Sequence, residues 1–283
     1  MRLLLFFLLL NPLCGQLPFK ITFKGEKKFQ ELTTQAVNEN WRALPIGERT
    51  AKVGMALRGI PYKGFTLEID NRIEAPSVNF YGLDCWTFFE NSLCFARMLE
   101  NKKPPYRPQD LLDEIEETRY FGGKCRGNYL DRIHYLVDWY SENSKRKVVR
   151  DITRTFPVAP IPSQAGEMSR MWKYYRYLKH NPELRPLMAK QEARLNRTKR
   201  WMVPQEKVAA IEKDLRNGDI IGIARNDGGS FCSHVGIIIK DQAGRARLLH
   251  ASSTHQKVIL DAPLEDYLKR HRQQAGAVIA RPQ

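Results

Sequence analysis

Hydrophobic residues recur at helical spacing through much of the first 215 positions. The clearest case follows Gly82, where Phe88, Phe89, Leu93 and Ala96 fit a 3.6-residue repeat. The same kind of pattern predicts helices over residues 48–57, 85–100, 110–117, 133–142, 167–180 and 204–215. Residues 64–81 are expected to form a loop or a short strand, and the proline-containing stretch 151–165 a loop.

The hydrophobic period changes after Gly218. Short runs rich in β-branched and aliphatic residues follow, separated by turn residues at 226–229 and 242–244. These runs predict strands over residues 220–224, 235–239, 246–250, 257–260 and 277–280. Helices followed by hairpins indicate an α+β fold. We expect one domain over residues 16–283, with a helical insertion at about 101–215 and a C-terminal antiparallel sheet at about 218–283.

The N-terminus differs in character from the rest of the chain. Arg2, the apolar run 3–10 and the small residue Gly15 have the order of a secretory signal peptide, predicted over residues 1–15. The apolar run is too short to span a bilayer. Lipid attachment at Cys14 is the alternative, although the residues before it fit that signal poorly. The sequence therefore predicts an exported protein, periplasmic or extracellular.

The charge balance is strongly basic. The formal net charge is +15 and the sequence pI is about 9.7. Such a protein is attracted to polyanions, and export argues against nucleic acid and for the cell wall or anionic lipid. Residues 166–201 hold ten Lys or Arg and three Asp or Glu, a net of +7. The predicted amphipathic helix over 167–180 could present this charge to anionic glycopeptides or remain a solvated face.

Cys85 is the first candidate for chemistry. It follows Gly82 and Asp84 at the predicted start of a helix. A helix N-terminus favours negative charge and thus the reactive thiolate, so we expect a lowered thiol pKa. The alternative is a buried structural thiol. Cys94 lies nine residues further along the same helix, on roughly its opposite side, where core packing or a disulfide with Cys125 suits it.

Two histidines flank one predicted turn. His234 and His250 are symmetric about residue 242. In a hairpin with an odd-length loop centred there, they lie directly opposite on one face, with Cβ atoms roughly 5 Å apart. One imidazole could then take the cysteine proton while the other orients it. Separate surface or packing roles remain open, and so does a zinc site with Cys232, which lacks an obvious fourth ligand.

Three motifs occur in the order typical of one enzyme family. They are Leu83-Asp84-Cys85-Trp86-Thr87-Phe88, Ser233-His234-Val235-Gly236-Ile237 and Leu249-His250-Ala251-Ser252-Ser253. With further matches such as Gly59-Ile60-Pro61-Tyr62, the chain resembles the NlpC/P60 superfamily of papain-like cell-wall hydrolases. It looks closest to the DUF1460 branch of N-acetylmuramoyl-L-alanine amidase-like proteins. The resemblance covers roughly residues 45–283.

The resemblance implies a papain-like fold, in which the helix bearing the cysteine packs on an antiparallel sheet bearing the base. It implies that Cys85 attacks an amide carbonyl, that His234 is the general base and acid, and that His250 orients His234. Tyr62 and the Cys85 backbone N–H would bind the oxyanion. The weaker candidates for substrate contact are Asp84, Thr87 and Ser233. No metal or cofactor is expected.

Trp86 departs from the pattern of many relatives, which carry a serine just after the cysteine. This change favours hydrolysis of the amide between N-acetylmuramic acid, or its anhydro form, and L-alanine. The alternatives are an endopeptidase that cuts between D-glutamate and the diamino acid, and a non-catalytic wall-binding module. The expected partners are peptidoglycan fragments and no nucleic acid, with the chain acting as a monomer.

Overall fold

The computed structural model describes residues 17–283. The predicted signal peptide and Cys14 therefore lie outside the described residues. The N-terminal part forms the helices α1 (Phe19–Thr22), α2 (Glu26–Asn38) and α3 (Ile46–Ala56), and α3 confirms the helix expected at 48–57. Within residues 17–283, no helix is both long and apolar enough to cross a membrane.

A single large sheet forms most of the C-terminal half. Its strands are β3 (Val149–Asp151), β4 (Ala159–Pro160), β5 (Trp201–Pro204), β6 (Ile220–Arg225), β7 (Cys232–Lys240), β8 (Ala246–Ser252), β9 (Lys257–Pro263) and β10 (Gln274–Pro282). They run in the order β4-β5-β10-β6-β7-β8-β9, with β3 also pairing β10, and every pairing is antiparallel. All five strands predicted from the sequence are present. The predicted helical insertion also supplies β3, β4 and β5.

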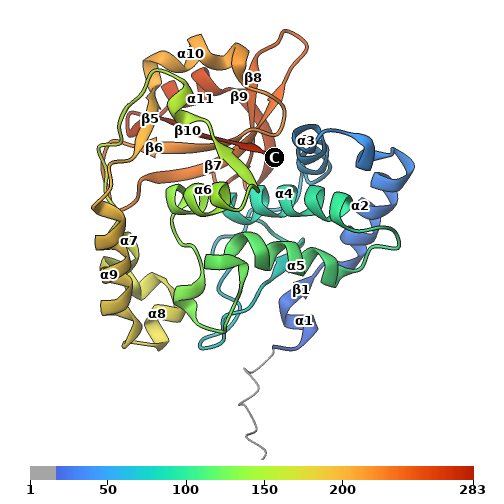
Figure 1. Ribbon diagram of the computed structural model, residues 1–283, viewed down its shortest axis with the longest axis horizontal. Coiled ribbons are helices and arrows are strands. Elements are labelled where there is room, and N and C mark those ends of the chain that lie inside the picture. The colour runs from blue at the N-terminus through green and yellow to red at the C-terminus, as the bar shows by residue number, and fades with distance from the viewer. Residues whose placement is uncertain (1–16) are drawn as a thin grey trace, which may run out of the picture.

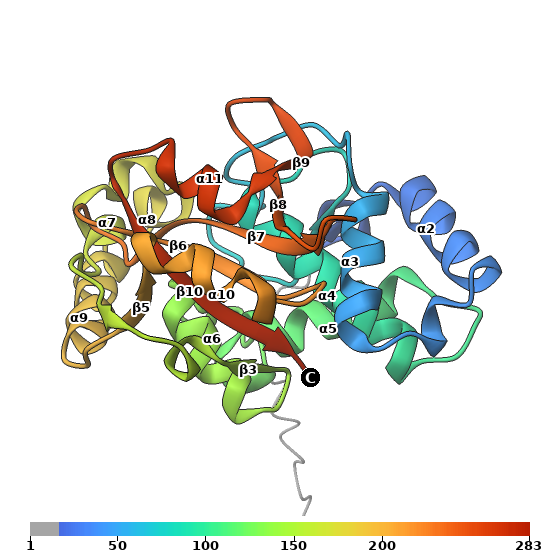
Figure 2. The ribbon, with the colours of Figure 1, turned by 90° about the horizontal axis from the view of Figure 1, so that it is seen from above.

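Helices cover both faces of this sheet (Figures 1 and 2). One face packs against α3, α4 (Cys85–Asn101) and α6 (Leu136–Lys145), with α5 (Pro108–Arg119) behind α4. The other face packs under the short helices α10 (Val208–Ile211) and α11 (Leu264–Lys269). Side chains alternate along β7, so Ile237 faces α3 and α4 while Ile238 belongs to the core under α11.

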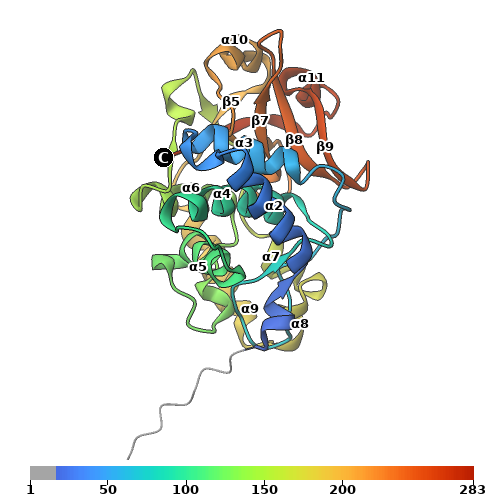
Figure 3. The same cartoon turned by 90° about the vertical axis from the view of Figure 1, so that its right-hand side faces the viewer.

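The helix predicted over residues 167–180 is wrong as a continuous element. It is broken into α7 (Glu167–Arg170), a 3₁₀ turn at Trp172–Tyr174 and α8 (Arg176–His180), followed by α9 (Leu184–Asn196). The break has a tertiary cause, because the Tyr177 N–H donates to Glu68 Oε2 at 2.9 Å instead of continuing a helix. In Figure 3, α7, α8 and α9 lie at the end of the molecule away from α10.

The helix predicted over 204–215 is largely wrong as well. Pro204 closes strand β5 opposite Gly276, and only the single turn α10 flanked by 3₁₀ turns follows it. The sequence pattern also missed α11 and strand β1 (Phe23–Lys24), which pairs in parallel with the short strand β2 (Val78–Asn79) inside the stretch 64–81. These elements are too short to carry a periodic signal.

Candidate active site

The first turn of α4 is fixed by a capping box. Asp84 Oδ1 accepts from the Thr87 N–H at 2.7 Å, and Thr87 Oγ1 accepts from the Asp84 N–H at 3.0 Å. Thr66 ties this cap to the preceding loop by donating to Asp84 Oδ2 at 3.1 Å. Cys85 is therefore the first residue of α4, as the sequence predicted, in a closely defined position.

Cys85 opens into a cavity of about 380 Å³. Tyr62, Asp84 and Ser233 line the same cavity, so three of the four predicted oxyanion or substrate-contact residues share it with Cys85. Thr87 does not line it. Its side chain is buried and committed to the capping box, which gives it a structural place rather than access to substrate.

The thiol of Cys85 is protonated at neutral pH, contrary to the sequence-based expectation. Burial raises the pKa of Cys85 to about 12, and the negative charge of Asp84 adds to this effect. Three backbone N–H groups act to lower this pKa, those of Val235 and of Cys85 and Trp86 at the start of the helix. Their effect is smaller than the rise caused by burial and by Asp84. A base would therefore be needed to form a thiolate at Cys85.

His234 and His250 share one face of the β7–β8 hairpin. The prediction that they lie directly opposite is wrong, because the pairs Ile237–Leu249 and Lys240–Ala246 centre the hairpin on residue 243. The two histidines are thus diagonal neighbours. Their side chains nevertheless meet, with His234 Nε2 and His250 Nδ1 2.6 Å apart.

Asp261 extends this pair, and sequence reasoning missed it. Its Oδ2 lies 3.3 Å from His250 Nε2. Asp261 follows Ile259, the pairing partner of His250, by two residues, so the strand period puts both side chains on one face. Burial acts to raise the Asp261 pKa, but hydrogen bonds from the Ala262 N–H and Arg270 outweigh it and lower the pKa overall. The carboxylate is therefore ionised.

The ionised carboxylate sets the direction of the chain of hydrogen bonds. A carboxylate only accepts, so His250 Nε2 carries the proton and His250 Nδ1 accepts. His234 Nε2 must then be the donor in the bond between the rings. This assignment leaves Nδ1 of His234 with a free lone pair. Burial lowers the pKa of His234 to about 3, with His250 contributing, so the ring is neutral at neutral pH.

Cys85 and the histidine pair line two different cavities, and Val235 and Tyr267 lie between them. The backbone N–H of Val235, next to His234, acts to lower the pKa of the Cys85 thiol. Tyr267 of α11 stacks on His234 with ring centroids 6.2 Å apart, and the charge of a Cys85 thiolate would raise the Tyr267 pKa. Within residues 17–283 the Cys85 sulfur makes no hydrogen bond to either imidazole. Direct transfer of its proton to His234 therefore requires the two side chains to come closer together.

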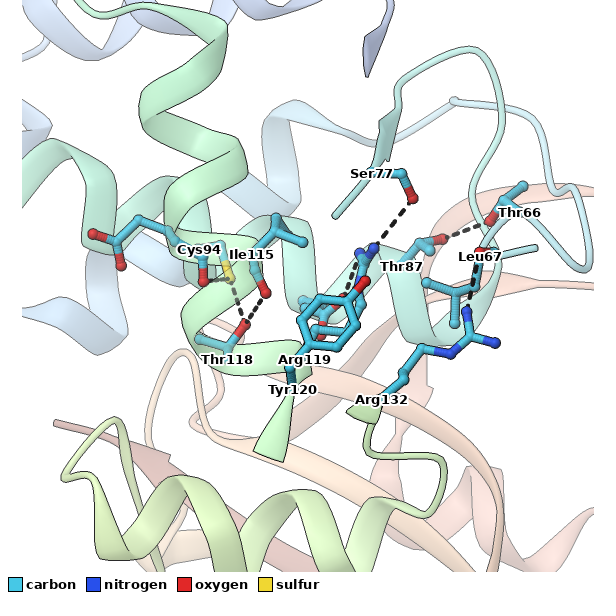
Figure 4. A network of polar contacts seen from close by, with 12 residues as sticks. Thr66, Leu67, Ser77, Thr87, Cys94, Ile115, Thr118, Arg119, Tyr120 and Arg132 are labelled. Atoms are coloured by element: carbon cyan, nitrogen blue, oxygen red, sulfur yellow. Dashed lines mark hydrogen bonds and ion pairs between the residues drawn. The ribbon is translucent and has the colours of Figure 1, made fainter. Parts of the chain in front are cut away.

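Buried charges hold the loop that forms one wall of the cavity (Figure 4). Arg132 donates to the Leu67 carbonyl at 3.0 Å and to Glu68 Oε1 at 3.2 Å. Arg119 donates to Ser77 Oγ at 3.2 Å and pairs with Glu90. The loop is thereby fixed to α4 and α5, since breaking a buried ion pair leaves an uncompensated charge.

The remaining cysteines take no part in a metal or disulfide cluster among the described residues. Cys85, Cys94, Cys125 and Cys232 are free thiols, and Cys94 Sγ lies 3.1 Å from Thr118 Oγ1 in the core. Cys232 packs beside Gly222, on the opposite face of the sheet from the histidines. Over residues 17–283, no group of three or more His, Cys, Asp or Glu is arranged to hold a metal ion.

Comparison with known proteins places these features in a family. A model of the AmiA-like, N-acetylmuramoyl-L-alanine amidase-like family matches residues 52–276. An N-acetylmuramoyl-L-alanine amidase from Bacteroides uniformis is 26% identical, with a TM-score of 0.74, over 84% of this chain and 99% of that protein. A Bacteroides fragilis protein whose name proposes xylanase activity is 31% identical, with a TM-score of 0.72, over 81% and 99%.

A Legionella pneumophila protein assigned to DUF1460 has the same fold at 18% identity, with a TM-score of 0.62, over 91% of this chain and 97% of that protein. Among curated proteins, none matches this chain. The family model covers most of the sequence, including Cys85, His234, His250 and Asp261. The protein therefore belongs to the AmiA-like family of N-acetylmuramoyl-L-alanine amidase-like proteins.

Proposed function

We propose that this protein is a cysteine-dependent amidase that hydrolyses the bond between N-acetylmuramic acid, or its anhydro form, and L-alanine in peptidoglycan fragments. One observation carries the mechanism. The hydrogen bonds from Asp261 through His250 to His234 leave Nδ1 of His234 as a proton acceptor, and His234 stacks on Tyr267, whose pKa a Cys85 thiolate would raise. Family membership supports the substrate class.

The reaction begins with proton transfer from Cys85 to Nδ1 of His234 while the sulfur attacks the lactyl carbonyl of the muramic acid. The backbone N–H of Cys85 and the Tyr62 hydroxyl stabilise the oxyanion. His234 then returns the proton to the L-alanine nitrogen, and the peptide leaves. The same ring activates the water that hydrolyses the muramoyl thioester and restores the thiol.

The proposal has two further parts. The protein is related to the papain-like NlpC/P60 enzymes, and it is exported from the cytoplasm. An antiparallel sheet carrying both histidines, with α4 packed on it, supports the first. The N-terminal sequence supports the second. Fractionation of cells expressing the full chain checks export, and recovery of the unprocessed chain in the cytoplasm would contradict it.

Two other activities are less well supported by the site. A glycosidase needs two available carboxyl groups across the scissile bond. Three carboxyl groups line the cavity. Glu68 is held by Arg132, Tyr129 and the Tyr177 N–H, Asp84 caps α4, and Glu167 accepts from the Tyr175 hydroxyl. An endopeptidase that cuts between D-glutamate and the diamino acid would use the same cysteine and histidines, so only its products distinguish it.

Product masses decide between these reactions. Purified mature protein and its Cys85→Ala variant are incubated with ordinary and anhydro muropeptides, and the products are analysed by mass spectrometry. We expect release of bare sugar and a peptide beginning with L-alanine, by the wild type alone. Cleavage inside the peptide would assign the endopeptidase reaction. Absence of any product, with binding to sacculi retained, would favour the wall-binding module.

A further inference from the structure

Phe65 occupies an unfavourable position that its own packing does not explain. Its backbone has φ = 59°, in the left-handed region that bulky residues rarely adopt. Its side chain is 63% exposed, so the ring gains little from burial. Strained residues of this kind persist only where the surroundings determine them, and they concentrate at functional sites.

The surroundings of Phe65 are rigid on its C-terminal side. Thr66 donates to Asp84 at the cap of α4, and the Glu68 N–H donates to the Phe65 carbonyl at 3.3 Å. The Glu68 carboxylate accepts in turn from Arg132 and Tyr129 in the buried network. The same contacts that fix the start of α4 therefore hold the Phe65 ring out of the core.

The exposed ring forms part of the wall of the Cys85 cavity. Tyr175 lines the same cavity and packs edge-on against Phe65, with ring centroids 6.3 Å apart and an interplanar angle of 80°. The Tyr175 hydroxyl donates to Glu167 Oε1 at 3.1 Å, which fixes the backing ring. An aromatic face at a cavity mouth suits a ligand with a flat apolar side and polar edges.

We propose that Phe65, backed by Tyr175, is the stacking platform of a saccharide subsite that receives the pyranose ring of the substrate. A pyranose presents C–H groups on its face and hydroxyl groups at its rim, which matches this surface. The inference rests on the proposed function, in which the acyl half of the substrate is a sugar. It assigns the sugar to the Cys85 cavity and makes Phe65 a determinant of specificity.

Three variants and two substrates test the platform. Phe65→Gly removes the ring and suits the positive φ, Phe65→Tyr keeps a ring, and Tyr81→Ala removes an equally exposed aromatic that does not line the cavity. The substrates are an N-acetylmuramoyl peptide and the same peptide acylated by 2-methoxypropanoate, which keeps the lactyl group without the sugar. Thermal unfolding is measured for each variant.

For Phe65→Gly we expect KM on the sugar substrate to rise about tenfold or more, with kcat nearly unchanged. Activity on the sugar-free substrate stays constant, and the unfolding temperature stays equal or rises because glycine accepts positive φ. Phe65→Tyr and Tyr81→Ala should behave like the wild type. Equal losses on both substrates, or no loss on the sugar substrate, would overturn the platform.

A binding measurement separates this inference from the proposed function. If the wild type cleaves neither substrate, methyl N-acetylmuramate is titrated into the full mature chain and followed by ligand-observed NMR. Binding that is lost in Phe65→Gly and kept in Phe65→Tyr would support the subsite without the amidase reaction. Absence of binding to the wild type, or equal binding by all variants, would refute the subsite.

Discussion

The direction of hydrogen bonding through His234 and His250 decides which nitrogen can act as a base. Either ring alone could hold its proton on either nitrogen. The contact with Asp261 removes this freedom, because the carboxylate requires a proton on His250 Nε2. In the proposed mechanism Asp261 is thus a positioning residue that acts through His250, and Arg270 holds it in place.

Replacing Asp261 by Asn tests this role. The amide can offer an N–H to His250 Nε2, which favours the opposite tautomers and places a proton on Nδ1 of His234. We expect kcat to fall about 10- to 100-fold with little change in KM, measured by steady-state kinetics on a muropeptide. Asp266→Asn, which removes an exposed acid on α11, is the matched control. An unchanged kcat in Asp261→Asn would contradict the relay.

At the residue scale, the sequence predicted the position of Cys85 and the pairing of the histidines better than it predicted the strand register and the ionisation of the thiol. Cys85 at a helix start and the histidine pair were found from spacing and motif. The thiol pKa was mispredicted, because burial is a tertiary effect that outweighs the helix N-terminus. Asp261 and Tyr267 were missed, since the first required the β8–β9 register, which contains a shift, and the second lies on an unpredicted helix.

The start of α4 is the element that joins stability to reactivity. Asp84 caps the helix, anchors Thr66 and also places a negative charge near the Cys85 sulfur. The first two effects stabilise the fold, whereas the charge opposes formation of the thiolate. Two substitutions at this position therefore separate capping from electrostatics.

Asp84→Ala should lower the free energy of unfolding by about 1 kcal/mol, as expected for a lost cap, measured by urea denaturation. Asp84→Asn should keep most of that stability, because its amide oxygen still accepts. It should also lower the raised pKa of Cys85 and speed alkylation of the thiol by iodoacetamide at every pH below the pKa. Asp110→Asn, in the capping box of α5, controls for loss of a buried charge elsewhere.

The pH profile of alkylation gives a second check on the same thiol. With a pKa near 12, the rate at Cys85 in the wild type should keep rising through alkaline pH. A plateau beginning below neutral pH would instead show a preformed thiolate, and the assignment of His234 as a general base acting on a thiol would be wrong.

Elements with long periodic patterns were predicted well, and elements set by tertiary contacts were not. The helix bearing Cys85 and the five C-terminal strands follow from periodicity alone. The pattern of residues 167–180 predicts a helix, yet the Tyr177 N–H in this segment donates to Glu68 and not to a helical carbonyl. Strand β5 was missed because it forms only through pairing with β4 and β10, which are distant in sequence.

For the whole molecule, the basic charge extends beyond residues 166–201. Within that segment most cations are exposed, and some also make contacts, such as Arg176 with Asn71 and Arg194 with Asp138. A groove of about 750 Å³ elsewhere gathers Arg58, Arg247 and Lys257, and it shares Asp261 and Arg270 with the cavity around the histidines. This groove is suited to the carboxylates of a peptide stem.

The double variant Arg58→Gln/Lys257→Gln tests this electrostatic contribution. Within residues 17–283 neither side chain forms an ion pair, so their loss should leave the fold intact. We expect kcat/KM for a stem-bearing muropeptide to fall several-fold at low salt, with a weaker dependence on ionic strength. Lys190→Gln/Lys207→Gln removes the same charge from other exposed positions. Equal effects of the two double variants would refute a specific role of the groove.

The identity of the acyl group on Cys85 tests the central claim most directly. The wild-type chain is mixed with a muropeptide, quenched in acid within its first turnovers, and analysed by intact-protein and peptide mass spectrometry. The proposed reaction predicts a thioester whose added mass is the N-acetylmuramoyl or anhydromuramoyl group, located on Cys85 and absent from Cys85→Ala. An adduct bearing the L-alanyl-D-glutamyl part of the stem, or an adduct on another residue, would contradict it.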